Sequence, residues 1–100
     1  MTGAQMIVAE RDRQITEEGF DPAHDRHHTD NELAIAAACY AVNGIPGVGV
    51  HEYGDEDCFP FVEEYDRRRD HGRLRSLVIA GALAAAEIDR LLAEEGNEAA

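Results

Sequence analysis

The sequence contains no lysine, only two cysteines and no long apolar run, and each shortage argues against a class of protein. Two cysteines, Cys39 and Cys58, do not make the disulfide framework of a small secreted domain, so we expect both thiols to be reduced. The chain has no basic start followed by an apolar segment, and no stretch of about 20 apolar residues that would span a bilayer. These absences predict a soluble, unexported protein of the cytoplasm.

Basic residues are scarce as well, because nine arginines face 21 acidic residues and the net charge is −12. A negative field of this size repels DNA and RNA, which argues against a nucleic-acid polymer as a partner. The arginines cluster at 67–69 and at Arg73 and Arg75, near the start of a predicted helix. Backbone N–H groups at a helix start favour an anion, so a small anionic ligand could bind there. A solvated face that neutralises the neighbouring acids explains the cluster equally well.

One hundred residues make one small domain, and we expect a single helical domain over residues 1–100. Apolar residues recur at three- and four-residue steps between residues 73 and 92, which predicts a long helix that the rest of the chain packs against. Its flat surface around Gly81 should let another backbone approach closely. The side that we expect to be buried comprises Leu74, Leu77, Val78, Gly81, Ala85, Ile88, Leu91 and Leu92.

The sequence as a whole predicts an all-α fold with three main helices and a long glycine-rich loop. The helices are expected over about residues 4–18, 30–42 and 73–95, with the loop at 44–60. Much of the apolar content is alanine, which buries little area, so we expect homo-oligomerisation through the alanine-rich helices.

The ends of the helices carry local signals. Residues 1–3 are expected to be frayed, and Gly19 and Gly96 to end the first and the last helix. Thr29 and Glu32 have the spacing of a capping box at the start of the second helix.

The first helix has polar residues where an amphipathic helix would have apolar ones. Ile7 and Ile15 define a face, yet Arg11 and Gln14 lie between them on that face, and Glu18 continues it. Either this helix packs only at its ends, or its polar side chains point inward and meet partners. In the second case Arg11 could hold an anion while Gln14 reads a base or an amide edge. The alternative is an internal salt bridge from Arg11 to an acid that orients the helix.

The sequence supports a metal site or a catalytic site less well than a binding pocket. The segment around His24 and Asp25 offers ligand types for zinc or manganese, but no clear second ligand set exists, so we predict no metal and no cofactor. No nucleophilic Ser/His/Asp order, P-loop or Cys-x-x-Cys motif is present. A magnesium site for nucleotide pyrophosphate hydrolysis stays open as an alternative, because all-helical enzymes of that kind use carboxylates on facing helices. The carboxylates that it would use are Glu17, Glu18, Glu63 and Asp66.

A set of motifs that spans about four-fifths of the chain resembles a family of small, largely uncharacterised phage and prophage helical proteins. The motifs are Glu10-Arg11-x-Arg13-Gln14, Glu18-Gly19-Phe20, His24-Asp25, His28, Glu32-Leu33, Ala36-Ala37-Ala38-Cys39-Tyr40-Ala41, Arg75-x-Leu77-Val78-x-Ala80-Gly81-Ala82-Leu83 and Ala86-Glu87-Ile88. The family usually has tryptophan where Phe20 stands, and a Trp/Pro-rich stretch in place of the glycine-rich loop. More distantly, the order of residues is similar to RyR-type repeat domains. That resemblance implies binding of a nucleotide, and in a phage it implies sequestration of a nucleotide-derived immune signal inside the host cell.

The expected function is therefore that of a small, non-enzymatic, phage-type binding protein that sequesters a nucleotide-like anion. The expected pocket consists of Arg11, Gln14, Phe20, Asp25 and His28, with Arg73 and Arg75 as phosphate contacts. The alternatives are the magnesium-dependent pyrophosphohydrolase and a purely structural or interaction protein.

Overall fold

The computed structural model describes residues 1–19, 31–49, 59–61 and 66–99, and these residues form helices and connecting segments without any strand. The helices among them are α1 (Gly3–Glu18), α3 (Glu32–Val42) and α4 (Arg73–Ala99), with a short 3₁₀ turn, η2 (Arg68–Asp70), before α4. The predicted all-α fold class is confirmed. No described helix is both long enough and apolar enough to cross a membrane.

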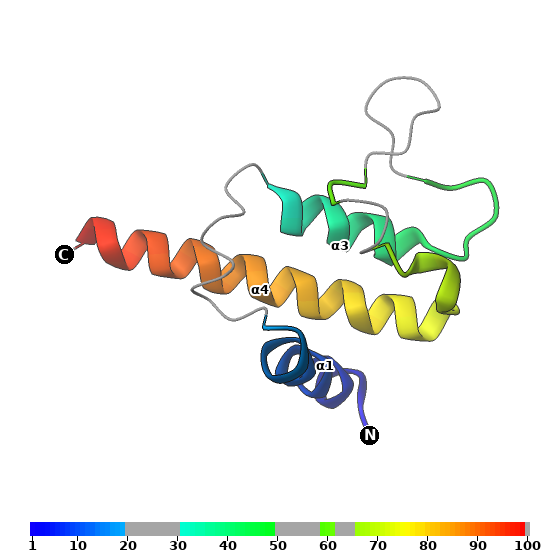
Figure 1. Ribbon diagram of the computed structural model, residues 1–100, viewed down its shortest axis with the longest axis horizontal. Coiled ribbons are helices and arrows are strands. Elements are labelled where there is room, and N and C mark those ends of the chain that lie inside the picture. The colour runs from blue at the N-terminus through cyan, green and yellow to red at the C-terminus, as the bar shows by residue number, and fades with distance from the viewer. Residues whose placement is uncertain (20–30, 50–58, 62–65, 100) are drawn as a thin grey trace.

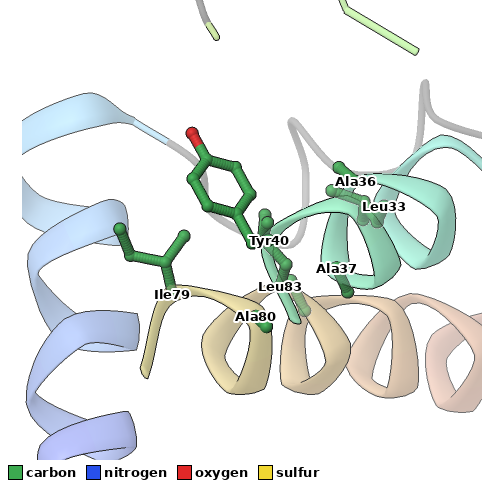
Figure 2. Packing of buried hydrophobic residues seen from close by; sticks show 8 residues of the cluster. Leu33, Ala36, Ala37, Tyr40, Ile79, Ala80 and Leu83 are labelled. Atoms are coloured by element: carbon green, nitrogen blue, oxygen red, sulfur yellow. The ribbon is translucent and has the colours of Figure 1, made fainter. Parts of the chain in front are cut away.

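The longest helix, α4, organises the described part of the molecule (Figure 1). Helix α3 lies alongside α4, whereas α1 is seen almost end-on below it and therefore crosses it steeply. Figure 2 shows the side chains that fill the space between α3 and α4. This buried cluster comprises Leu33, Ala36, Ala37 and Tyr40 of α3 and Ile79, Ala80, Leu83 and Ala86 of α4. Because half of these residues are alanines, the two helices pack closely but bury little apolar area.

Helix α1 contacts α4 at a glycine. A Cβ atom added to Gly81 would lie 2.5 Å from Cδ1 and 2.8 Å from Cγ1 of Ile7. Both distances are far below a normal carbon–carbon contact, so only glycine fits under Ile7 in this arrangement. The close approach expected around Gly81 is therefore made within the chain, by a side chain of α1. The oligomer expected from the alanine-rich helices stays a prediction.

The predicted buried side of the long helix is wrong for its largest members. Five leucine and isoleucine side chains of that stripe are between 43% and 67% exposed: Leu74, Leu77, Ile88, Leu91 and Leu92. The face that packs against α3 instead carries Ile79, Leu83 and Ala86. The prediction gave most weight to the largest apolar side chains, whereas α3 packs on a neighbouring sector of α4 that mixes Ile79 and Leu83 with alanines.

The start of the chain is ordered, contrary to the expected fraying of residues 1–3. Thr2 caps α1, because its hydroxyl accepts a hydrogen bond from the Gln5 backbone N–H at 3.2 Å. In return, the Gln5 side chain accepts one from the Thr2 backbone N–H at 2.8 Å. This is a capping box in which Gln occupies the position of the usual Glu. At the other end, Gly19 caps the helix in the left-handed conformation (φ 73°), as predicted.

The starts and ends of the other helices differ from the predictions by a few residues. Helix α3 begins at Glu32, with Asn31 as its N-cap at φ 65° and without a side-chain capping bond. The predicted start near residue 30 is thus too early, and Thr29 of the expected capping box lies outside the described residues. Helix α4 continues through Gly96 to Ala99, so the predicted stop at Gly96 is wrong.

Candidate functional site

The buried residues of α1 are all polar. Glu10 is 2% exposed, Arg11 7% and Gln14 3%. They lie on the side of α1 that faces α4, between the partly buried Ile7 and Ile15. The hypothesis that polar side chains point inward and meet partners is therefore confirmed, and packing at the helix ends alone is excluded.

Glu10 is the centre of this polar cluster. Its two carboxylate oxygens accept hydrogen bonds from Nε and Nη2 of Arg13, both at 2.9 Å, which is the bidentate geometry of a strong ion pair. Gln14 donates a third bond through Nε2 at 3.1 Å. Arg75 of α4 forms an ion pair with the same carboxylate. Because Arg13 and Gln14 belong to α1 and Arg75 belongs to α4, the carboxylate ties the two helices together.

The charge state of Glu10 depends on these partners. Burial raises the pKa of its carboxyl group, but the hydrogen bonds and positive charges of Arg13 and Arg75 outweigh burial, and the net pKa lies below the ordinary value of 4.5. The pKa of Arg13 is raised by the same contact with Glu10. Asp66 behaves similarly, because a hydrogen bond from Arg68 lowers the pKa of its carboxyl group.

The lowered pKa values predict that the protein loses stability in acid. A carboxyl group whose pKa is depressed in the folded state contributes stability above its unfolded pKa, and this contribution is lost as the pH falls through the folded pKa. We therefore expect the free energy of unfolding to fall as the pH drops below about 4.5, the unfolded value for Glu10. Urea titrations of wild type and Glu10→Gln over this range measure the effect. The stability difference between the two proteins should narrow towards acid, and a constant difference would contradict the assignment to Glu10.

Arg11 and Gln14 lie one turn apart on the same buried stripe. Nη2 of Arg11 is 3.9 Å from a carboxylate oxygen of Asp89 on α4, so the internal salt bridge considered from the sequence is present, though long. Gln14 donates through Nε2 to Glu10, which fixes the orientation of its amide, since a carboxylate only accepts. Its other atom, Oε1, is buried and accepts no hydrogen bond within the described chain. This orphaned acceptor is the feature of the cluster that its internal contacts leave unexplained.

The structure brings together some of the predicted site residues. Arg75 and Gln14 meet at the carboxylate of Glu10, whereas Arg11, on the same buried face, pairs with Asp89 of α4. Arg73 does not join the cluster. Its Nη1 donates hydrogen bonds to two backbone oxygens at the C-terminal end of α3, that of Ala41 and, at 3.1 Å, that of Asn43. The remaining predicted residues, Phe20, Asp25 and His28, lie outside the described residues.

A second polar centre, which the sequence analysis did not single out, surrounds Asn43. Its side-chain amide nitrogen lies 2.7 Å from the backbone oxygen of Arg68, 2.8 Å from the hydroxyl of Ser76 and 3.3 Å from the backbone oxygen of His71. One amide thus joins the end of α3 to η2 and to the first turn of α4. The only sequence signal was the Asn43-Gly44 pair, which was interpreted as a helix stop.

Next to Asn43 lies an open cavity of about 270 Å³ lined by Asn43, Asp66, Arg68 and Arg69. Arg68 pairs with Asp66 through two nitrogens, at 2.8 and 2.6 Å, and its guanidinium lies 4.7 Å from the centre of the Phe59 ring. The positive charge of Arg68 is therefore balanced by Asp66. Arg68 and Arg69 belong to the arginine cluster at 67–69 that the sequence suggested for a small anion, but the cavity contains none of the residues of the expected pocket.

The carboxylates of the hydrolase alternative have arginine partners. Glu17 and Glu18 lie 3.5 and 3.2 Å from Arg13, and Asp66 is paired with Arg68; Glu63 lies outside the described residues. In the part of the chain that the structure describes, no three His, Cys, Asp or Glu side chains come together as metal ligands do.

Comparisons of the sequence with models of protein families and with curated proteins, and of the fold with solved structures, find no match. The site must therefore be interpreted from its own chemistry, and the resemblance to phage proteins stays a prediction.

Proposed function

We propose that this protein is a non-enzymatic binding protein that sequesters a small nucleotide-like anion at the inner face of α1. The observation that carries the proposal is the buried Oε1 atom of Gln14, which has no hydrogen-bond donor within the described chain. A buried acceptor without a donor costs about 1–3 kcal/mol, and a ligand that supplies an N–H group would recover this energy.

The fixed orientation of Gln14 also limits what it can recognise. Since Nε2 is already bonded to Glu10, only the oxygen is available, so the ligand must present a donor such as an exocyclic amino group or a ring N–H. Arg11, one turn away, and Arg75, whose side chain is 40% exposed, supply positive charge to the same region. A donor edge together with negative charge is the combination that a nucleotide offers.

The proposal includes the residues of the predicted pocket that lie outside the described chain, Phe20, Asp25 and His28, as further contacts. In this proposal no bond of the ligand is broken, and the protein acts by lowering the ligand's free concentration. A cyclic or linear signalling nucleotide, as the phage resemblance implies, is one member of this ligand class.

A thermal-shift screen of nucleotides and cyclic nucleotides tests the proposal. A ligand present at 100 times its dissociation constant stabilises the folded state by about 2.7 kcal/mol, which raises the melting temperature of a domain of this size by several degrees. The variants Gln14→Met and Arg11→Met should each lose the shift relative to their own unliganded melting temperature. Arg69→Ala should keep it, because this exposed arginine belongs to the arginine cluster at 67–69 and lies outside the polar cluster around Glu10.

The same samples distinguish sequestration from hydrolysis. After incubation with magnesium, the bound nucleotide should be recovered unchanged, whereas release of pyrophosphate would identify the hydrolase alternative. If no nucleotide in the screen shifts the melting temperature of the folded protein, the proposal fails.

A further inference from the structure

The C-terminal half of α4 carries an exposed apolar patch that consists of Ile88, Leu91 and Leu92. These side chains are 56%, 44% and 59% exposed, and their spacing of three and four residues places them on one face of the helix. Figure 1 shows that this half of α4 continues beyond both α3 and α1, towards the C-terminus. The described chain therefore leaves the α4 patch open to a partner.

Acidic side chains surround the α4 patch. The side chains of Asp89 and Glu94 are 50% and 55% exposed, and Glu95 is exposed as well. Arg90, the basic residue within this stretch, is buried and is paired with Glu87 at 2.5 Å and with Glu94 at 3.0 Å. The surface next to the apolar side chains is thus negative, in a chain whose net charge is −12.

Charge decides between the possible occupants of the α4 patch. A second copy that used the same patch would bring Asp89, Glu94 and Glu95 of both copies together, and like charges at an interface cost several kcal/mol. An anionic lipid surface would be repelled for the same reason. A partner with basic residues beside an apolar face would match both the aliphatic side chains and the carboxylates.

We infer that the α4 patch is a docking site for a basic amphipathic helix of a partner protein. The apolar face of that helix covers Ile88, Leu91 and Leu92, and its Lys or Arg residues face Asp89, Glu94 and Glu95. The patch adjoins the polar cluster at Asp89, which also pairs with Arg11. The inference is carried by the exposed apolar side chains and by Glu94 and Glu95, and it does not require that Arg11 and Gln14 bind a ligand.

Synthetic peptides test this inference with the full chain. The probe is a fluorescent helical peptide of about five turns, with leucines on one face and lysines on the other. The comparison peptide has glutamates in place of the lysines. Fluorescence anisotropy gives both affinities, and we expect the basic peptide to bind at least tenfold more tightly.

The double variant Leu91→Ser/Leu92→Ser should weaken binding of the basic peptide at least tenfold. Leu74→Ser is the matched control, because Leu74 is a 67% exposed leucine of the same helix outside the patch, and it should leave the affinity unchanged within twofold. Since these residues are exposed, circular dichroism should show the same helix content in all variants.

Three results would overturn the inference. The first is no binding of the basic peptide to the wild-type chain. The second is either an unchanged affinity in Leu91→Ser/Leu92→Ser, which would indicate non-specific attraction between an acidic protein and a basic peptide, or equal weakening by Leu74→Ser, which would show that binding is not confined to the patch. The third is a wild-type dimer, seen by light scattering, that the Leu91→Ser/Leu92→Ser variant separates, because the occupant would then be a second copy.

Discussion

Gly81→Val is expected to lower the free energy of unfolding by about 3 kcal/mol, a large share of the stability of a small domain. A Cβ atom at this position would overlap with Cδ1 and Cγ1 of Ile7, and the two further methyl groups of valine increase the overlap. To make room, the Ile7 side chain must leave its present rotamer or α1 must shift on α4, and either change loses packing at the crossing. Urea unfolding followed by circular dichroism measures the loss.

Gly96→Ala is the matched control for this substitution. Gly96 also lies within α4, but nothing is within 4 Å of a Cβ atom added there, so alanine should stabilise the helix by up to about 1 kcal/mol. Combining Gly81→Val with Ile7→Ala should recover part of the loss, since the smaller side chain removes the overlap. If the two glycine substitutions changed stability in the same direction, the close contact with Ile7 would be of no energetic importance.

Glu10→Ala is also expected to lower the free energy of unfolding by about 3 kcal/mol. It removes the acceptor of bonds from Arg13, Gln14 and Arg75 and leaves the buried amide of Gln14 without any partner. Breaking a buried ion pair costs about 3–5 kcal/mol, and the partial exposure of Arg13 and Arg75 places this case at the lower end. Thermal and urea unfolding measure the change.

Glu17→Ala is the control for the loss of a carboxylate from α1. Glu17 also contacts Arg13, at 3.5 Å, but its side chain is 65% exposed. The free energy of unfolding of Glu17→Ala should therefore stay within about 0.5 kcal/mol of the wild-type value. The double variant Glu10→Ala/Arg13→Ala should lose less stability than the two single variants lose together, because the Glu10 and Arg13 side chains belong to one network. A loss for Glu10→Ala no larger than that for Glu17→Ala would show that the cluster does not hold α1 in place.

Much of the fold could be predicted from local sequence signals. The long helix α4 was located by the periodicity of its apolar residues, and Gly19 ends α1 in the left-handed conformation, as predicted. The capping box at Thr2 was missed because the first three residues were expected to be frayed. Helix α4 passes through Gly96 because one glycine lowers helix propensity by only about 1 kcal/mol. A local preference of about 1 kcal/mol is small, so the packing of the rest of the structure decides whether a helix follows it.

The buried face of α4 could not be predicted from side-chain size. Leu74 and Leu92 looked like core residues, yet α3 packs on the sector with Ile79 and Ala86, and both leucines are exposed. A pattern identifies an apolar face but not which partner covers it. Helix α4 has apolar or small residues around most of its circumference, so the pattern alone left more than one face available.

Part of the candidate site could be predicted from the sequence, and part could not. Arg11 and Gln14 interrupt an apolar stripe, and their burial follows from that interruption. Glu10 was one polar residue among several in the first helix, and its central role depends on Arg75, which lies 65 residues later in the sequence. A contact across such a separation has no local signal.

The polar cluster under α1 also restricts how this helix can sit on α4. Alanine and glycine surfaces are smooth, and two such helices can slide or rotate past one another at little cost. With Glu10 facing Arg75, a rotation of α1 by one residue would bring Arg11 towards Arg75 and place two positive charges together. Opposite charges at this crossing therefore give α1 one permitted orientation, which the small residues around Gly81 would not impose by themselves.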